Sequence, residues 1–131
     1  MNVYVAGKFE KKDVVLDVCT KLQARGHSVA YDWTTHKPIK PYVENQALAK
    51  TYSENEVSGI ARCDVFICLA DEKGTTLMME FGAALMHATL TGKPVVYAVG
   101  AFNDQSLWFF NALVRRKQTV EEAIEDIQCL S

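Results

Sequence analysis

The residue of this chain best placed to do chemistry is an isolated glutamate, Glu80. It lies within the apolar segment Gly74–Leu85 and is the only acidic residue between Glu72 and Asp104. The segment is predicted to be a helix that follows a strand, and it offers the carboxylate no polar face to join. A lone carboxylate near the start of a buried helix indicates a nucleophile or an acid rather than a solubilising charge.

A second glutamate, Glu56, lies on a predicted helix from about residue 44 to residue 62. At 100° per residue it falls in the middle of an apolar face. That face consists of Leu48, Ala49, Tyr52 and Ile60. Desolvation there would raise the pKa of Glu56 and suit proton donation at neutral pH. The spacing fits equally well a peripheral acid paired with a basic residue such as Arg62.

The elements that must position these carboxylates alternate between β-branched runs and helical stretches, as in a parallel sheet covered on both faces. Strands are predicted at residues 3–6, 28–32, 64–69, 94–99 and 112–115. Helices are predicted at about residues 11–25, 44–62, 74–91 and 119–129, with Gly26 ending the first and a Thr119–Glu122 capping box starting the last. Residues 33–43 are predicted to form a proline-marked loop. We therefore expect one domain over residues 1–131, an α/β three-layer sandwich with a five-stranded parallel sheet.

In open parallel sheets the ligand lies beyond the carboxyl ends of the strands, which selects the residues that follow each strand. The predicted substrate-binding residues are Gly7, Lys8, Phe9, Trp33, Asp71, Gly74, Thr75, Thr76 and Asn103. Amides near Thr75 and Thr76, at the start of a helix, could bind an oxyanion. Trp33 could stack on a nucleobase or equally well cover the edge of the sheet.

Composition excludes several classes of function. A hydrophobic share of 49%, 23% charged residues and a net charge of −2 offer no electrostatic footprint for a nucleic-acid polymer or an acidic membrane. The four cysteines show neither C-x-x-C nor zinc-like spacing, so we expect reduced core thiols, no metal and a cytoplasmic location. The first residues are predicted to form a strand without a basic leader, and no segment is apolar enough to span a membrane.

Other conspicuous residues are assigned structural roles. His87 is expected to be a satisfied core or interface histidine, with a proton relay as the alternative. His36 is expected to be a surface histidine in the loop, although from there it could reach a substrate. Tyr4 alternates with valines on a buried strand, so packing is its expected role, although its hydroxyl could reach the site. Met78, Met79 and Met86 are expected to fill the core.

Three segments together resemble the nucleoside 2-deoxyribosyltransferase family, which includes the 2′-deoxynucleoside 5′-monophosphate N-glycosidases. They are Val3–Gly7, Ala61–Ile67 and, most distinctively, Met79–Leu85. The resemblance implies a flavodoxin-like sheet, no metal or cofactor, and Glu80 as a nucleophile toward the anomeric carbon of a sugar. In the family, an aspartate that contacts the base or the sugar stands at the position of Glu56. The resemblance therefore implies the same role for Glu56, with a glutamate in place of the aspartate.

The resemblance is incomplete in the residues that recognise the substrate. Some transferases bind the base with an aspartate six residues before the nucleophile; Gly74 stands there, so Asp71 or Glu72 would have to substitute. The monophosphate glycosidases hold the 5′-phosphate with a serine and glycine loop and basic residues. Lys8, Thr75 and Thr76 could supply such contacts here.

The resemblance also implies a homodimer or higher homo-oligomer. Family members complete each site with a residue of a neighbouring subunit, near residues 103–106 of this chain, and the apolar run Leu107–Phe110 would suit the interface. The predicted function is cleavage or transfer of the N-glycosidic bond of a small-molecule (deoxy)nucleoside or its 5′-monophosphate through a covalent glycosyl-Glu80 intermediate. Two alternatives remain open: a non-catalytic nucleotide-binding sensor, and a glutamate-dependent hydrolase of another ribosyl compound such as NAD.

Overall fold

The computed structural model describes residues 1–130, in which strands and helices alternate along the chain. The strands are β1 (Asn2–Ala6), β2 (Ser28–Val29), β3 (Val65–Leu69), β4 (Val95–Val99) and β5 (Val114–Lys117). The α-helices are α1 (Lys12–Ala24), α2 (Gln46–Arg62), α3 (Thr75–Thr91) and α4 (Val120–Gln128). Short 3₁₀ helices are η1 (Phe9–Lys11), η2 (Trp33–Thr35), η3 (Tyr42–Glu44) and η4 (Leu107–Phe110).

The five strands form one sheet in the order β2-β1-β3-β4-β5, and every neighbouring pair is parallel. This is the strand order of the flavodoxin-like fold, so the predicted fold class is confirmed. After β1 the chain adds β2 on one side, and it then crosses back to add β3 on the other side of β1, so the strand order reverses between β1 and β3. Residues Val3 to Ala6 of β1 pair with Val65 to Cys68 of β3. Such a switch point is where folds of this type bind their ligands.

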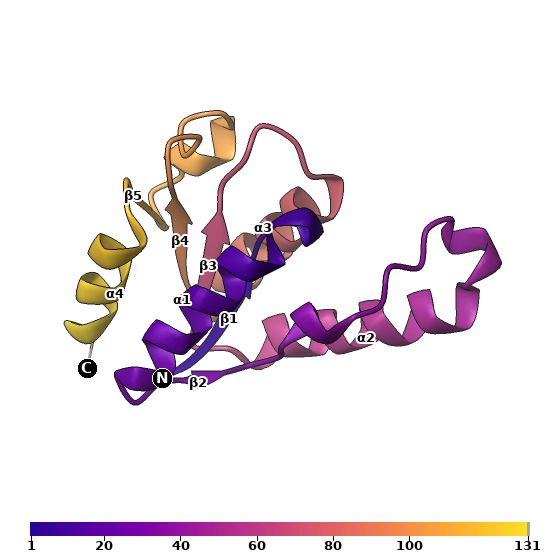
Figure 1. The fold of residues 1–131 in the computed structure, drawn as a ribbon. Helices are drawn as coiled ribbons and strands as arrows, with labels where there is room; N and C mark the ends of the chain where they lie inside the picture. The colour runs from indigo at the N-terminus through magenta and orange to yellow at the C-terminus, as the bar shows by residue number, and fades with distance from the viewer. Residues whose placement is uncertain (131) are drawn as a thin grey trace.

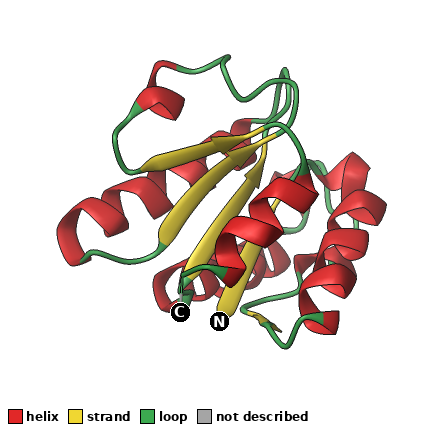
Figure 2. Cartoon of the chain, turned by 90° about the vertical axis from the view of Figure 1, so that its left-hand side faces the viewer, coloured by secondary structure: helices red, strands yellow, loops and turns green. Residues whose placement is uncertain are grey.

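Helices cover both faces of the sheet (Figure 2). Helices α1 and α4 lie on one face, where Lys21 of α1 contacts Glu121 of α4 at 2.9 Å. Helices α2 and α3 pack together on the other face, and η4 joins them through an edge-to-face contact of Phe109 with Phe81 of α3. Right-handed crossovers on a sheet of this strand order require this division of the helices.

The core is centred on β1, β3 and β4, whose side chains are almost entirely buried. Tyr4 and Phe66, on paired strands, stack with ring centroids 5.6 Å apart on the face that carries α2 and α3. Tyr97 faces the other side and donates its hydroxyl to Asp126 of α4 at 2.6 Å. Near-continuous apolar strands are buried on both faces, which is why their sequences do not alternate with polar residues.

The helix ends follow the predicted signals closely. Gly26 has φ of +87° and follows the end of α1, and the next residue, His27, donates its backbone N–H to the carbonyl of Leu22. This pairing is the Schellman motif that the glycine predicts. Thr119 caps α4 by accepting from the N–H of Glu122 at 3.1 Å, whereas the Glu122 carboxylate accepts from Gln118 and leaves the capping box half formed.

The structure corrects several predicted boundaries. Strand β2 ends at Val29, because Asp32 caps the 3₁₀ helix η2 and turns the chain away from the sheet. Strand β5 covers Val114–Lys117, later than the predicted 112–115, after Asn111 has ended η4. The predicted loop 33–43 contains η2 and the start of η3.

The apolar face predicted for α2 is only partly packed. Gly59 and Ile60 are buried, whereas Leu48 is exposed. Figure 1 shows the reason, since the loop before α2 and the first half of the helix extend away from the sheet. None of the helices within residues 1–130 is long and apolar enough to cross a membrane.

Candidate active site

The centre of the candidate site is a hydrogen bond between the first strand and the third long helix. The hydroxyl of Tyr4, on β1, donates to Oε2 of Glu80, on α3, over 2.5 Å. Tyr4 is fully buried and Glu80 is part-buried. Tyr4 is therefore more than a packing residue, because its hydroxyl holds the carboxylate in one orientation.

The surroundings make Glu80 a weak acid. Burial raises the pKa of Glu80 to about 8, the hydrogen bond from Tyr4 acts in the opposite direction, and the carboxyl of Glu56 raises the pKa further. Burial also raises the pKa of Tyr4, and Glu80 adds to this increase, so the hydroxyl remains a proton donor. A carboxylate with this environment has the perturbed acidity expected of functional sites.

Glu56 belongs to the same site. Burial raises its pKa, and its charge is felt at Glu80. Arg62, the basic partner considered from the sequence, donates instead to Ser58 and to the carbonyl of Ala30. The two candidate catalytic glutamates are thus electrostatically coupled. The alternative prediction, an ion pair between Glu56 and Arg62, is wrong.

The titratable neighbour of Glu56 is a histidine, His36, that was expected from the sequence to lie on the surface. His36 is buried, and its Nδ1 lies 3.4 Å from Oε2 of Glu56. Tyr31 and Tyr52 enclose the same ring. Tyr52 and Glu56 share one face of α2 at i and i+4, which was visible in the sequence, but no local pattern places the loop residue His36 beside them.

The loop after β1 and the start of α3 come together at the carboxyl edge of the sheet. A Cβ on Gly7 would lie 2.7 Å from Val15, so only glycine fits there. Gly74 has φ of +143°, and a Cβ on it would lie 3.4 Å from Cγ of Lys8. Lys8 therefore lies against the N-terminus of α3, the positive end of the helix dipole.

Thr75 and Thr76 form the exposed first turn of α3. No side chain caps this helix, and its first hydrogen bond in this region runs from the N–H of Met78 to the carbonyl of Gly74. The N–H groups of a first turn have no acceptor within the helix, and they attract anions. The predicted oxyanion position is therefore geometrically available beside Lys8.

Other predicted contacts fall in a separate hollow of about 380 Å³. Gly7, Lys8 and Asp71 line it, together with side chains from the first turns of α1 and from the start of α4. The ammonium of Lys11 lies 2.5 Å from Asp71 and lowers the pKa of that carboxyl. Glu80 and Glu56 do not line this hollow, because they project from the helices on the other face of the sheet.

Three predicted substrate-binding residues have packing contacts of their own. Trp33 is buried and donates its indole N–H to the carbonyl of Val5 at 2.8 Å, as expected for a residue that covers the sheet. Phe9 lies beside it, with ring centroids 6.4 Å apart. Asn103 is buried and donates its side-chain amide to the carbonyl of Lys117 at 2.9 Å, which secures the end of β5.

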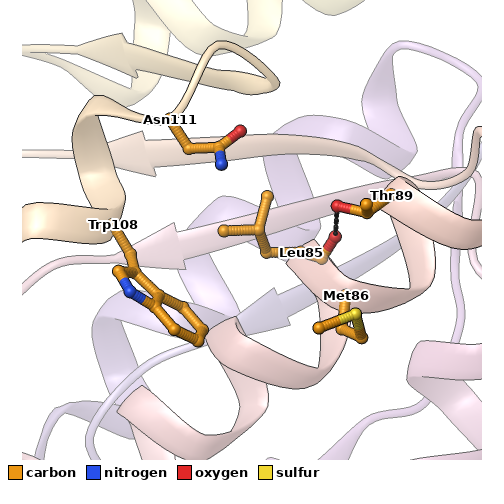
Figure 3. A pocket seen from close by; sticks show the side chains of 5 residues that line it. All are labelled: Leu85, Met86, Thr89, Trp108 and Asn111. Atoms are coloured by element: carbon orange, nitrogen blue, oxygen red, sulfur yellow. Dashed lines mark hydrogen bonds between the residues drawn. The ribbon is translucent and has the colours of Figure 1, made fainter.

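A second, shallow hollow of about 250 Å³ lies between α3 and η4 (Figure 3), and neither Glu56 nor Glu80 is among the residues that line it. It is bordered by Leu85, Met86, Thr89, Trp108 and Asn111. Met86 and Trp108 of this lining are exposed, and the same two elements, α3 and η4, also expose Met79, Leu90, Leu107 and Phe110. We call these six residues the α3–η4 face. Met79 and Met86, predicted to fill the core, instead belong to this surface.

Within residues 1–130, no cluster of three or more His, Cys, Asp or Glu side chains is arranged to hold a metal ion. Cys19, Cys63 and Cys68 are buried thiols, and Cys129 is exposed. His87 donates its Nε2–H to the carbonyl oxygen of Ala61, near the end of α2, over 3.1 Å, as a satisfied interface histidine would.

Fold and site together define a flavodoxin-like α/β domain with two coupled carboxyls beside the switch point of its sheet. No protein-family profile and no curated protein sequence matches this chain. Among solved structures, it is similar to the CMP N-glycosidase BcmB of Clostridium botulinum, with a TM-score of 0.62 and 17% sequence identity. The similarity covers 98% of each chain, so the two proteins share the fold over their whole lengths.

Proposed function

We propose that this protein breaks the N-glycosidic bond of a nucleoside or nucleoside 5′-monophosphate, with Glu80 as the nucleophile. The observation that carries the proposal is the 2.5 Å hydrogen bond by which Tyr4 orients the Glu80 carboxylate, beside the second acid Glu56. Two coupled carboxyls are the minimum equipment for glycoside chemistry by a covalent route. The full-length structural similarity to a nucleotide N-glycosidase supports the same class of reaction.

In the first step, an oxygen of ionised Glu80 attacks the anomeric carbon of the sugar. The bond between that carbon and the base nitrogen breaks, its electron pair leaves with the base, and Glu56 supplies the proton that neutralises the base. The product is a glycosyl ester of Glu80. Tyr4, with its donor hydroxyl, holds the second carboxyl oxygen throughout.

In the second step, an acceptor attacks the same carbon and releases Glu80 as a carboxylate. If the acceptor is water, it gives a proton to the ionised Glu56 as it attacks, and the protein is a glycosidase. A second base as acceptor would make it a transferase. Two displacements at one carbon retain the configuration of the sugar.

The reaction requires one proton on the pair of glutamates, held by Glu56 while Glu80 is ionised. Burial raises the pKa of both carboxyls, and each charge opposes the other, so the pair loses its last proton only as the pH passes about 8. Either glutamate of the coupled pair can carry that proton, and the reactive arrangement is the form with the proton on Glu56.

The start of α3 is the proposed site of a 5′-phosphate. Lys8 lies against Gly74, and the uncapped amides of Thr75 and Thr76 point out of the positive end of the helix. Backbone amides at a helix N-terminus and a lysine ammonium are both common phosphate ligands. A nucleoside 5′-monophosphate is for this reason our preferred substrate class.

The protein is also proposed to form a homo-oligomer. The α3–η4 face exposes six large apolar side chains, among them Leu107 with 85% of its surface accessible. Exposed apolar side chains gathered on two neighbouring elements of a small domain are typical of an interface between subunits.

The test is a survey of base release by chromatography, with intact-mass analysis of the protein. The panel should contain ribo- and deoxynucleosides and their 5′-monophosphates, and it should include CMP because the structurally similar BcmB is a CMP N-glycosidase. Wild type is compared with Glu80→Gln and with Glu54→Gln, an exposed glutamate of α2. We expect release by wild type and Glu54→Gln, and a loss of roughly 10⁴-fold or more in Glu80→Gln.

A glycosyl adduct on wild type that is absent from Glu80→Gln would identify the covalent intermediate. Folded wild-type protein that releases no base from any member of the panel would overturn the proposed function. Equal release by the Glu80→Gln variant would overturn the role of Glu80.

A further inference from the structure

The strongest unassigned feature of the molecule is the set of contacts around His36. The His36 ring stacks on Tyr52 with centroids 3.7 Å apart and planes 4° from parallel. Its Nε2 lies 2.6 Å from the Tyr31 hydroxyl oxygen. An imidazole held on one face and at one nitrogen has little freedom to rotate.

The backbone fixes the position of the same ring. Asp32 caps η2 by accepting from the N–H of Thr34, and the N–H of His36 donates to the carbonyl of Trp33. The next residue, Lys37, donates its backbone N–H to the Tyr52 hydroxyl at 3.1 Å. The loop therefore cannot withdraw His36 without breaking its contact with α2.

The free edge of the clamped ring faces the catalytic pair. Nδ1 of His36 lies 3.4 Å from Oε2 of Glu56. This separation is long for a hydrogen bond, but catalytic hydrogen bonds often shorten only when substrate binds. A ring held from two sides is well suited to orient a carboxyl group on its third side.

Hydrogen-bond inventory selects one tautomer. An ionised carboxylate can only accept, so Nδ1 must carry the ring proton if it is to bind Glu56 once that acid has given up its own proton. With a neutral ring, Nε2 is then an acceptor, and the Tyr31 hydroxyl must be its donor. All three groups are satisfied together in this arrangement.

We propose that His36 is a positioning residue for Glu56: its Nδ1–H binds Oε2, which leaves Oε1 to carry the proton that the departing base receives. The bond persists after the proton has moved and stabilises the carboxylate that remains. The role in turnover rests on the proposed function, whereas the tautomer and the contact with Glu56 do not.

The groups that face His36 agree with a neutral ring. They are Tyr31 and Asp32, which lie between β2 and η2, and Tyr52 and Glu56 of α2. Burial lowers the pKa of His36, and the negative charge of Asp32 acts in the opposite direction. A neutral imidazole is the form that the proposed tautomer needs.

The first test is nuclear magnetic resonance of protein labelled with ¹⁵N and ¹³C, read at the ring nitrogens of His36 and at the carboxyl carbon of Glu56. We expect Nδ1 to be protonated and Nε2 to be the bare nitrogen. In Tyr31→Phe, which removes the donor to Nε2, we expect a mixture of tautomers. A wild-type ring protonated at Nε2 alone would overturn the proposal.

The second test uses three substitutions of His36 that separate its contacts. His36→Asn keeps an N–H near the position of Nδ1, His36→Gln places its amide near Nε2, and His36→Phe keeps only the stacking on Tyr52. We expect the pKa of Glu56 to rise by roughly one unit in His36→Phe and His36→Gln, because both lose the donor that stabilises the charged carboxylate. The rise should be smaller in His36→Asn, which keeps that donor.

An unchanged Glu56 titration in both the Phe and the Gln variant would overturn the contact. If a His36 variant does not fold, the wild-type tautomer and its response to Tyr31→Phe still decide the proposal.

The third test measures base release. We expect kcat to fall by about tenfold in His36→Phe with KM nearly unchanged, a smaller loss than the ~10²-fold or more that removal of a general acid causes, and partial recovery in His36→Asn. Equal kcat in wild type and His36→Phe would overturn the role in turnover. If wild type itself releases no base, the proposed function fails, and the magnetic resonance measurements test His36 independently.

Discussion

At the scale of single residues, Glu80 shows what a buried carboxylate costs the fold. Its carboxyl is part-buried against the sheet and accepts from the hydroxyl of Tyr4; among residues 1–130, no basic side chain is hydrogen-bonded to it. Desolvation disfavours the charged form, and the single hydrogen bond offsets only part of that cost. The pKa of about 8 expresses this imbalance.

The stability of the protein should therefore depend on pH through Glu80. Its pKa is raised from 4.5 to about 8 on folding, so the folded state binds the proton more tightly. The resulting stability is complete below pH 4.5 and is lost as the pH rises to about 8. Glu80→Gln resembles the protonated form at every pH, and we expect it to be more stable than wild type by about 2–4 kcal/mol at pH 8.5.

Urea unfolding at pH 4 and pH 8.5 measures this difference. The gain should nearly vanish at pH 4, where wild type is protonated. Glu54→Gln, at an exposed site, should show no such dependence on pH. A Glu80→Gln variant less stable than wild type at pH 8.5 would show that the carboxylate is better solvated than its contacts indicate.

At the scale of elements, the approach of α2 to the sheet decides whether the two glutamates can cooperate. Gly59 is buried at this crossing, three residues after Glu56. A Cβ there would lie 2.9 Å from Cβ of Tyr31 and 3.1 Å from the ring of Tyr4. Those tyrosines hold His36 and Glu80 respectively, so one close contact positions both halves of the site.

For this reason, Gly59→Ala should destabilise the protein, although alanine has the higher helix propensity. In a free helix, replacing glycine by alanine stabilises by about 0.5–1 kcal/mol. Here we expect a loss of about 1–3 kcal/mol, because the methyl group must displace α2 or the tyrosine rings. Base release should fall with it. Urea unfolding and base-release kinetics measure both effects, with the exposed Val57→Ala as the control on the same helix.

A Gly59→Ala protein that is stabilised and fully active would contradict the close packing of α2 on Tyr4 and Tyr31. A protein that is destabilised but fully active would show that the spacing of the glutamates tolerates movement of the helix.

At the scale of the whole molecule, the two sides of α3 have different roles. One side presents Glu80 to the sheet, and the other contributes Met79, Met86 and Leu90 to the α3–η4 face. The rest of this face comes from η4, whose Trp108 borders the shallow hollow seen in Figure 3. Association over this face would bring a second copy close to the helix that carries Glu80, the proposed nucleophile.

Trp108→Glu should weaken that association. A charge in the middle of an apolar interface cannot be solvated, and we expect the apparent dissociation constant to rise by about 100-fold or more. Sedimentation velocity over a range of concentrations measures it. Val57→Glu, which places the same charge on an exposed apolar site of α2, is the matched control.

A wild-type protein that sediments as a monomer at all concentrations would overturn the proposed homo-oligomer. An oligomer that Val57→Glu disrupts and Trp108→Glu does not would place the interface on α2 instead.

Much of the architecture was predictable, because strand and helix patterns are local. The apolar runs at β1, β3 and β4, Gly26 at the end of α1 and Thr119 at the start of α4 all behave as predicted. The edges of the sheet were less well predicted. Strand β2 is short and β5 is displaced, since capping by Asp32 and the end of η4 override β-propensity there.

The sequence by itself determined the parallel α/β fold and singled out Glu80 and Glu56, because periodicity and a misplaced charge are visible within one helix. Only the tertiary structure decided that Tyr4 donates to Glu80, that Arg62 turns away from Glu56, and that the buried His36 faces it. These contacts join residues from separate elements. Their geometry depends on how α2, α3 and η2 pack against β1, which no spacing along the chain encodes.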